Sequence, residues 1–145
     1  MADLTDLERW CNVLPGRIDD AANVLARQVT TAIGSDVIDH TPVDTSEAES
    51  NWQASLGAAP FAPLPAIFEG ERGSTAAESA QAAKEHIART LREKRPGEVV
   101  YLSNLAEHIV DLNDGTSKQE PRGFVERAEA KGAREADTKG LEIKA

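Results

Sequence analysis

The sequence has 145 residues, which suffices for one domain with a modest core and is too short for two. With 16 basic against 25 acidic side chains it carries a formal net charge of −9, and it lacks the basic stripe with which proteins grip nucleic acid. Only 4% of the residues are aromatic, so we expect a thin core whose stability depends partly on self-assembly.

Disulfides and membrane spans are not expected either. The single cysteine, Cys11, excludes an internal disulfide and suits a reducing cytoplasm. The sequence has no run of 18 apolar residues and no basic N-terminal region followed by an apolar run. We therefore expect neither a signal peptide nor a membrane-spanning segment.

The acidic charge is concentrated in the first third of the chain. Residues 1–49 contain ten Asp and Glu side chains and three Arg side chains, which gives this part a net charge of −7. Two interpretations stay open at this point. The acidic residues either form a solvated face that keeps the protein soluble, or a surface that repels DNA and lets it slide past.

A short helix is predicted at the start of the chain. Apolar residues recur every three or four positions over Leu4–Leu14, which is typical of an amphipathic helix, and Asp3 or Thr5 is available to cap it. Pro15–Gly16 then interrupts the pattern, although a proline is also tolerated in the first turn of a following helix.

A longer helix is predicted from Ile18 to about His40. Its apolar stripe consists of Ala22, Leu25, Val29, Ile33 and Val37. The helix should end there because Pro42 disfavours helical geometry at the residue before it. A stripe of this length predicts a helix that covers a sheet.

Residues 41–73 predict a turn, a brief helix, a strand and an irregular segment. Thr41–Thr45 is typical of a turn, and Asp44 followed by Glu47 indicates a helix start. Residues 51–56 alternate loosely and predict a strand. Residues 57–73 contain three prolines and three glycines, which excludes a regular helix and favours an arm or loop that packs on a neighbour.

The second half predicts two more long helices around one strand. Ser74 is a plausible cap for a helix that Pro96–Gly97 ends, and residues 98–104 are the clearest strand. A helical turn over 105–112 and a polar loop follow. Phe124 begins a final helix, which we expect to fray beyond Arg134 because the sequence there is charged and rich in alanine.

These elements together predict an α+β fold. A small antiparallel β-sheet packs against the long N-terminal helix and a second long helix, and the Pro/Gly-rich loop protrudes. We assign residues 1–137 to a single domain and expect 138–145 to be a frayed tail.

No motif for catalysis or metal binding is found in the sequence. The histidines at positions 40, 86 and 108 lie in different predicted elements without partners at metal-ligand spacing. Glu107, His108 and Asp111 are the nearest approach to an acid–base cluster, since residues three and four apart share a helix face. A structural hydrogen bond explains this spacing equally well, so we expect no enzyme and no cofactor; a small hydrolase would have to gather these three side chains in one pocket.

Two segments of the sequence form a longer pattern. The first is TPVDT at 41–45 followed by Asn51–Trp52, and the second is YLSN at 101–104 followed by GTSKQEP and GFV within 115–125. Their order and spacing resemble the neck or tail-completion (head-tail joining) proteins of tailed bacteriophages, typified by gene product ten of phage Hong Kong ninety-seven. The first segment is similar to the signature TPVDTG-x-L-x-x-SW of that family, in which a glycine stands where this chain has Ser46.

The resemblance implies a virion structural protein without cofactor or catalysis. Such a protein forms a ring, a hexamer or a dodecamer, between the portal-side connector and the tail. Its expected partners are further copies of itself, the connector or head-completion protein, and the tail terminator or tail tube protein. DNA passes through without specific binding, no membrane is involved, and the ring is assembled in the host cytoplasm and remains in the neck of the virion.

Two surfaces are assigned by hypothesis on this basis. The intersubunit or ring-to-ring contacts are expected at Phe61, Leu64, Ile67, Phe68, Asp114, Gly115, Thr116, Ser117, Lys118, Gln119 and Pro121. A lumen or acidic outer face is expected at Asp19, Asp20, Asp36 and Asp39. The competing interpretation is a soluble acidic adaptor or regulatory binding module that is not part of a virion.

Overall fold

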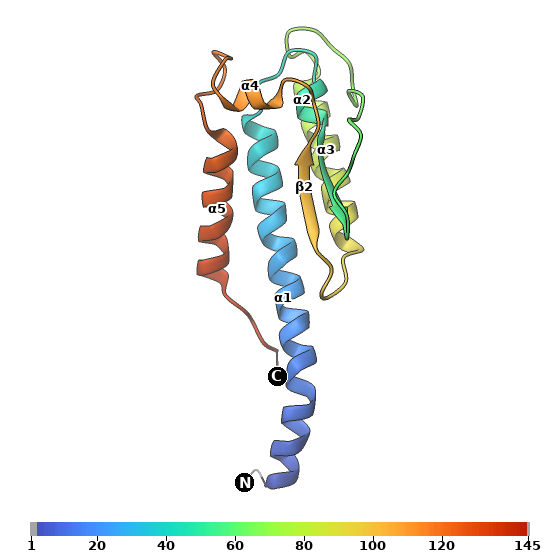
Figure 1. The fold of residues 1–145 in the computed structure, drawn as a ribbon, viewed down its shortest axis with the longest axis vertical. Helices are drawn as coiled ribbons and strands as arrows, with labels where there is room; N and C mark the ends of the chain where they lie inside the picture. Colours follow the sequence, from blue (N-terminus) through green and yellow to red (C-terminus); the bar gives the residue numbers. More distant parts are fainter. Residues whose placement is uncertain (1–2, 145) are drawn as a thin grey trace.

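The computed structural model describes residues 3–144 (Figure 1). In chain order the elements are α1 (Leu4–His40), α2 (Glu47–Ser50), β1 (Trp52–Leu56), α3 (Ala76–Arg92), β2 (Val100–Asn104), α4 (Ile109–Asn113) and α5 (Phe124–Lys139). The predicted α+β class is confirmed: a long N-terminal helix, a two-stranded antiparallel sheet, and further helices packed against them. Within residues 3–144, no helix has the length and apolar character needed to cross a membrane.

The first helix is continuous over 37 residues, so the predicted break at Pro15–Gly16 is wrong. Proline removes one backbone hydrogen bond of a helix. Pro15 lies on an exposed part of α1, where water can bond the freed carbonyl. The predicted cap at Asp3 is confirmed, because its carboxylate accepts the N–H of Asp6 at 2.9 Å. The helix ends at His40, as expected from Pro42.

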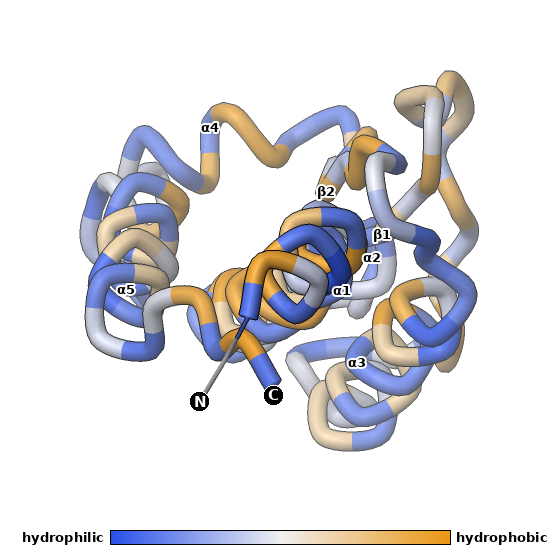
Figure 2. The backbone as a smooth tube through the Cα atoms, turned by 90° about the horizontal axis from the view of Figure 1, so that it is seen from below, coloured by the Kyte–Doolittle hydropathy of each residue, from blue (hydrophilic) through white to orange (hydrophobic). Residues whose placement is uncertain are grey.

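The helix α1 lies between two layers of the molecule (Figure 2). On one side it packs against α5, and on the other against the sheet and α3. Gly132 of α5 allows a close approach, since a methyl group at this position would lie only 2.4 Å from Cγ1 of Ile33. The central position of α1 follows from having apolar residues on more than one face.

The sheet and the core lie beside the upper half of α1. The strands β1 and β2 pair antiparallel, with Trp52 opposite Asn104 and Leu56 opposite Val100. The buried core consists of Val37, Ile38, Trp52, Ala54, Ala83, Ile87, Leu91, Phe124 and Ala128. It therefore joins α1, β1, α3 and α5, as a single domain requires.

A cluster of polar side chains fastens the end of α3 to the middle of α1. Asn23 and Arg27 both donate hydrogen bonds to the carbonyl oxygen of Lys94, at 3.2 and 2.5 Å. The buried Lys94 in turn donates from Nζ to Oδ1 of Asn23 at 2.7 Å. Cations near a helix C-terminus interact favourably with the helix dipole, so this clamp stabilises both elements.

The final helix extends further than predicted. It runs to Lys139 and ends at Gly140, whose φ of +58° is typical of a residue that ends a helix. A salt bridge of 3.3 Å between Lys139 and Glu135 supports the last turn, so fraying from Arg134 is wrong. Residues 140–144 have no regular structure and cross from the end of α5 toward α1 (Figure 1).

Candidate interaction surface

The turn at Thr41–Thr45 is held by buried hydrogen bonds to the core. The indole N–H of Trp52 donates to Oγ1 of Thr41 at 2.8 Å, and this hydroxyl donates to the carbonyl oxygen of Val37 at 2.6 Å. Thr41 is 4% and Trp52 is 5% exposed, so both bonds are shielded from water. They fix the start of β1 against the end of α1.

Ser46, which directly follows this turn, has an unusual backbone conformation. Its φ is +66°, in the left-handed region that favours glycine, and its hydroxyl lies 2.9 Å from Oγ1 of Thr75. Ser46 is the N-cap of α2, so the prediction that Asp44 begins this helix is wrong. The carboxylate of Asp44 instead accepts the N–H of Arg72 at 2.9 Å and thereby fixes the far end of the 57–73 segment.

The Pro/Gly-rich segment is irregular, as predicted, but it is attached to its own molecule. It runs back along β1 (Figure 1), where Asn51 accepts the N–H of Leu64 at 2.6 Å and donates to its carbonyl oxygen at 2.8 Å. The N–H of Ile67 donates to Oγ of Ser50 at 3.0 Å. Side-chain hydrogen bonds thus replace the ladder that a third strand would form.

The four apolar residues predicted to make contacts in this segment differ in exposure. Phe61 is 98% exposed, Ile67 and Phe68 are 40% and 48% exposed, and Leu64 is half-buried. A fully exposed phenylalanine costs free energy in water. Phe61 is therefore the apolar side chain of this segment that is most available to a neighbour.

The loop between α4 and α5 is closed by hydrogen bonds at both ends. The N–H of Gly123 donates to the carbonyl oxygen of Asn113 at 2.8 Å, and the side chain of Asn113 accepts the N–H of Val125 at 3.0 Å. Arg127 donates to the carbonyl oxygen of Arg122 at 2.7 Å and forms an ion pair with Glu120. The shape of the loop is thus set within the monomer.

The turn at 41–45 and the loop at 114–123 meet at one end of the fold. The side-chain amide of Gln119 accepts the N–H of Val43 at 3.0 Å and donates to the carbonyl oxygen of Val43 at 3.1 Å. A depression of about 380 Å³ lies between the two segments, and both residues line it. The predicted contact residues of the loop are accessible: Asp114, Gly115, Thr116, Lys118, Gln119 and Pro121 are exposed and Ser117 is half-buried.

The four aspartates assigned to an acidic face have different surroundings. Asp36 forms a salt bridge of 2.9 Å with Lys131 of α5, and this hydrogen bond raises the pKa of Lys131. Asp39 pairs with Lys84 of α3 at 2.5 Å. Asp19 and Asp20 are exposed on the lower part of α1. Two of the four therefore hold helices together, and they do not line one free surface.

Glu49 is a buried carboxylate that sequence analysis does not single out. It is 3% exposed, and its Oε2 has no hydrogen-bond partner within residues 3–144. The pKa of Glu49 is raised to about 7, chiefly by burial and also by the neighbouring Asp39, while Lys84 acts in the opposite direction. The segment EAES at 47–50 is polar throughout, so periodicity does not reveal which residue points inward.

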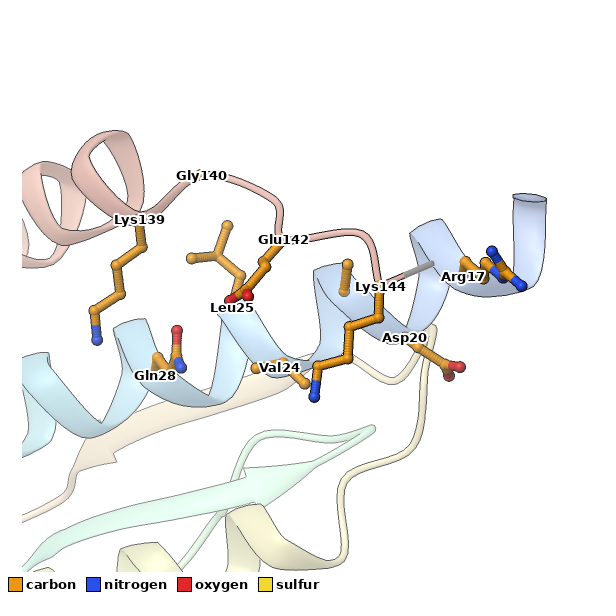
Figure 3. A pocket seen from close by; sticks show the side chains of 10 residues that line it. Arg17, Asp20, Val24, Leu25, Gln28, Lys139, Gly140, Glu142 and Lys144 are labelled. Atoms are coloured by element: carbon orange, nitrogen blue, oxygen red, sulfur yellow. The ribbon is translucent and has the colours of Figure 1, made fainter. Parts of the chain in front are cut away.

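A cavity of about 620 Å³ lies between α1 and the end of the chain (Figure 3). It is lined by Arg17, Asp20, Ala21, Val24, Leu25, Gln28, Lys139, Gly140, Glu142 and Lys144. Three cations and two carboxylates surround an apolar floor, so the lining has no single chemical preference.

The side chains of Glu107, His108 and Asp111 do not have the geometry of a catalytic acid–base cluster. Glu107, His108 and Asp111 are all exposed, and no hydrogen bond joins any two of them. Within residues 3–144, no group of three or more His, Cys, Asp and Glu side chains is placed to hold a metal ion.

No protein-family model, curated protein or solved structure matches this chain.

Proposed function

We propose that this chain is a virion structural protein of a tailed phage, which forms part of a ring in the neck and joins the connector to the tail. The proposal rests on the resemblance of two sequence segments to the neck and tail-completion proteins. The observation that carries it is the contact between them: Gln119 of the second segment hydrogen-bonds both backbone groups of Val43 in the first.

The backbone of Ser46 supports the same proposal. The family signature has glycine at this position, and Ser46 takes a positive φ that glycine adopts without steric cost. A turn that needs a positive φ at one position favours glycine there. The positive φ of Ser46 therefore supports the resemblance at this turn, although the residue differs.

The attachment of the loops to the monomer suits a joint between subunits. The loop at 114–123 and the segment at 57–73 are both exposed and both held by hydrogen bonds within the chain. A surface that is ordered before binding loses less conformational entropy on assembly. We therefore place the subunit contacts on Phe61 and on the loop that contains Gln119.

Phage assembly with a Phe61→Asp variant tests this proposal. The variant is expected to fold normally, since Phe61 is 98% exposed, and to leave free heads and free tails in place of joined particles. Val99→Asp is the matched control, at an apolar residue that is 57% exposed and directly precedes β2. A point variant is preferable to a deletion of residues 60–68, because the deletion removes the partners of Ser50 and Asn51.

The position of the protein in the particle provides a direct check. Gold-labelled antibodies against the chain should mark the necks of purified virions of the phage that encodes it. Infectious particles assembled with Phe61→Asp would contradict the proposed contact. Label found in lysates and never on particles would instead favour the soluble acidic adaptor.

A further inference from the structure

The lower part of α1 extends beyond the rest of the fold (Figure 1), and several of its apolar side chains are exposed. Leu4, Leu7 and Trp10 are 84%, 57% and 51% exposed, and Ile18 is 38% exposed. Large apolar side chains gathered on one free helix mark an interaction site more often than a solvated surface.

Three of these side chains, together with Cys11 and Leu14, form one line along the helix. With about 100° per residue, the five lie within about 40° of a common direction. This N-terminal stripe consists of Leu4, Leu7, Cys11, Leu14 and Ile18. Their spacing of three and four residues is that of a helix that packs on another helix.

The N-terminal stripe lies in line with the part of α1 that α5 covers. Further along the same line lie Leu25 and Val29, and Val29 faces α5 at Gly132. At this position α5 covers the line, and its Lys131 pairs with Asp36 of α1 at 2.9 Å. The packing of α5 thus indicates which kind of partner the N-terminal stripe accepts: a helix with a small or apolar seam and a flanking cation.

The charges beside the N-terminal stripe narrow the choice of partner. Glu8 and Asp19 project on one flank and are exposed, and the whole segment 3–20 has five acidic and two basic side chains. A second copy of this segment would bring like charges together, which is destabilising. A partner with lysine or arginine beside its apolar seam would be attracted instead.

We propose that the N-terminal stripe of α1 binds an amphipathic helix of a different protein, with Lys or Arg side chains flanking its apolar seam. The bound helix continues along α1 from the place where the covering chain ends, near the cavity closed by Lys139 and Lys144. This inference does not depend on the proposed virion role, because it concerns a separate surface from Phe61 and Gln119.

Two synthetic peptides test the charge preference on the full-length protein. Both are roughly three heptads long with leucine at the a and d positions; one has lysine and the other glutamate at e and g. The lysine peptide should bind at least about tenfold more tightly in a fluorescence anisotropy titration, with affinity that falls as salt is added. The half-exposed Trp10 should shift its emission to shorter wavelength on binding.

Variants of the protein separate the stripe from its charged flank. Leu7→Asp combined with Leu14→Asp should weaken binding of the lysine peptide at least about tenfold, whereas Ile67→Asp, an exposed apolar residue elsewhere, should leave it unchanged. Glu8→Lys combined with Asp19→Lys should reverse the preference toward the glutamate peptide. Circular dichroism and the emission of the buried Trp52 verify folding.

Three results would overturn the inference. The first is equal affinity for the two peptides, and the second is unchanged binding by the variant of Leu7 and Leu14. The third is reversible self-association, seen by sedimentation in the absence of peptide and abolished by the same two substitutions, which would assign the stripe to a second copy of the chain.

Discussion

Replacing Glu49 by glutamine is expected to stabilise the protein at alkaline pH. The native carboxylate is buried beside Asp39, with Oε2 unpartnered within residues 3–144, and its pKa is raised from 4.5 to about 7. The folded state therefore holds a proton that the unfolded state has released between these two values. Stability falls as pH rises through this window, because the folded chain binds more protons than the unfolded one.

The size of the effect follows from the two pKa values. Each pKa unit corresponds to about 1.36 kcal/mol, so ionising Glu49 in the folded state costs at most about 3 kcal/mol. Local relaxation reduces this cost, and we expect Glu49→Gln to be more stable than the wild type by about 1–3 kcal/mol at pH 8.5. At pH 4 the two proteins should differ by less than about 1 kcal/mol, since both side chains are then neutral.

Urea denaturation followed by the emission of Trp52 measures this difference. The free energy of unfolding should be determined for both proteins between pH 4 and pH 8.5. Glu47→Gln is the matched control, because Glu47 lies in the same short helix and is exposed. Parallel pH profiles for Glu49→Gln and wild type would refute the reasoning, as would an equal effect of Glu47→Gln.

Substitutions at three further positions test the turns that hold the candidate surface. Thr41→Val leaves the buried indole N–H of Trp52 without its acceptor and should cost about 1–3 kcal/mol in urea denaturation; an unchanged midpoint would contradict it. Ser46→Gly should be more stable than Ser46→Ala by about 1 kcal/mol, because only alanine retains the strain of a positive φ, and equal stabilities would show that the turn is unstrained. Gly115→Ala should lower the melting temperature, since φ is +89° and a methyl group would lie 3.1 Å from Cβ of Arg122. A melting temperature equal to that of the wild type would refute the prediction at Gly115.

The sequence predicted the elements whose apolar residues repeat with a regular period. The helix over Ala76–Arg92 buries Ala83, Ile87 and Leu91, whose four-residue spacing places them on one face. The strand at 52–56 was likewise recognisable. The predicted break at Pro15 is wrong because proline breaks a helix only where the lost hydrogen bond cannot be replaced. This depends on exposure, which local sequence does not encode.

The candidate surface depends on contacts between distant residues, which explains why only parts of it were predictable. The exposed positions of Phe61 and the 114–121 loop follow from composition and from turn residues. The hydrogen bonds between Gln119 and Val43 join residues 76 positions apart, and no local sequence pattern predicts them. The burial of Glu49 is equally a tertiary effect, since a four-residue helix has too few residues to show a period.

The central position of α1 has a consequence for how the chain folds during synthesis. Its partners are far away in sequence: Asn23 bonds Lys94 across 71 residues, and Asp36 pairs with Lys131 across 95. α1 is synthesised first, but the elements that cover it are synthesised later. Its apolar faces therefore stay exposed to solvent for some time, because contacts of high sequence separation form slowly. Nascent chains that end before Phe124 lack α5 altogether, so release from the ribosome ahead of that residue would leave α1 open to aggregation or to chaperones.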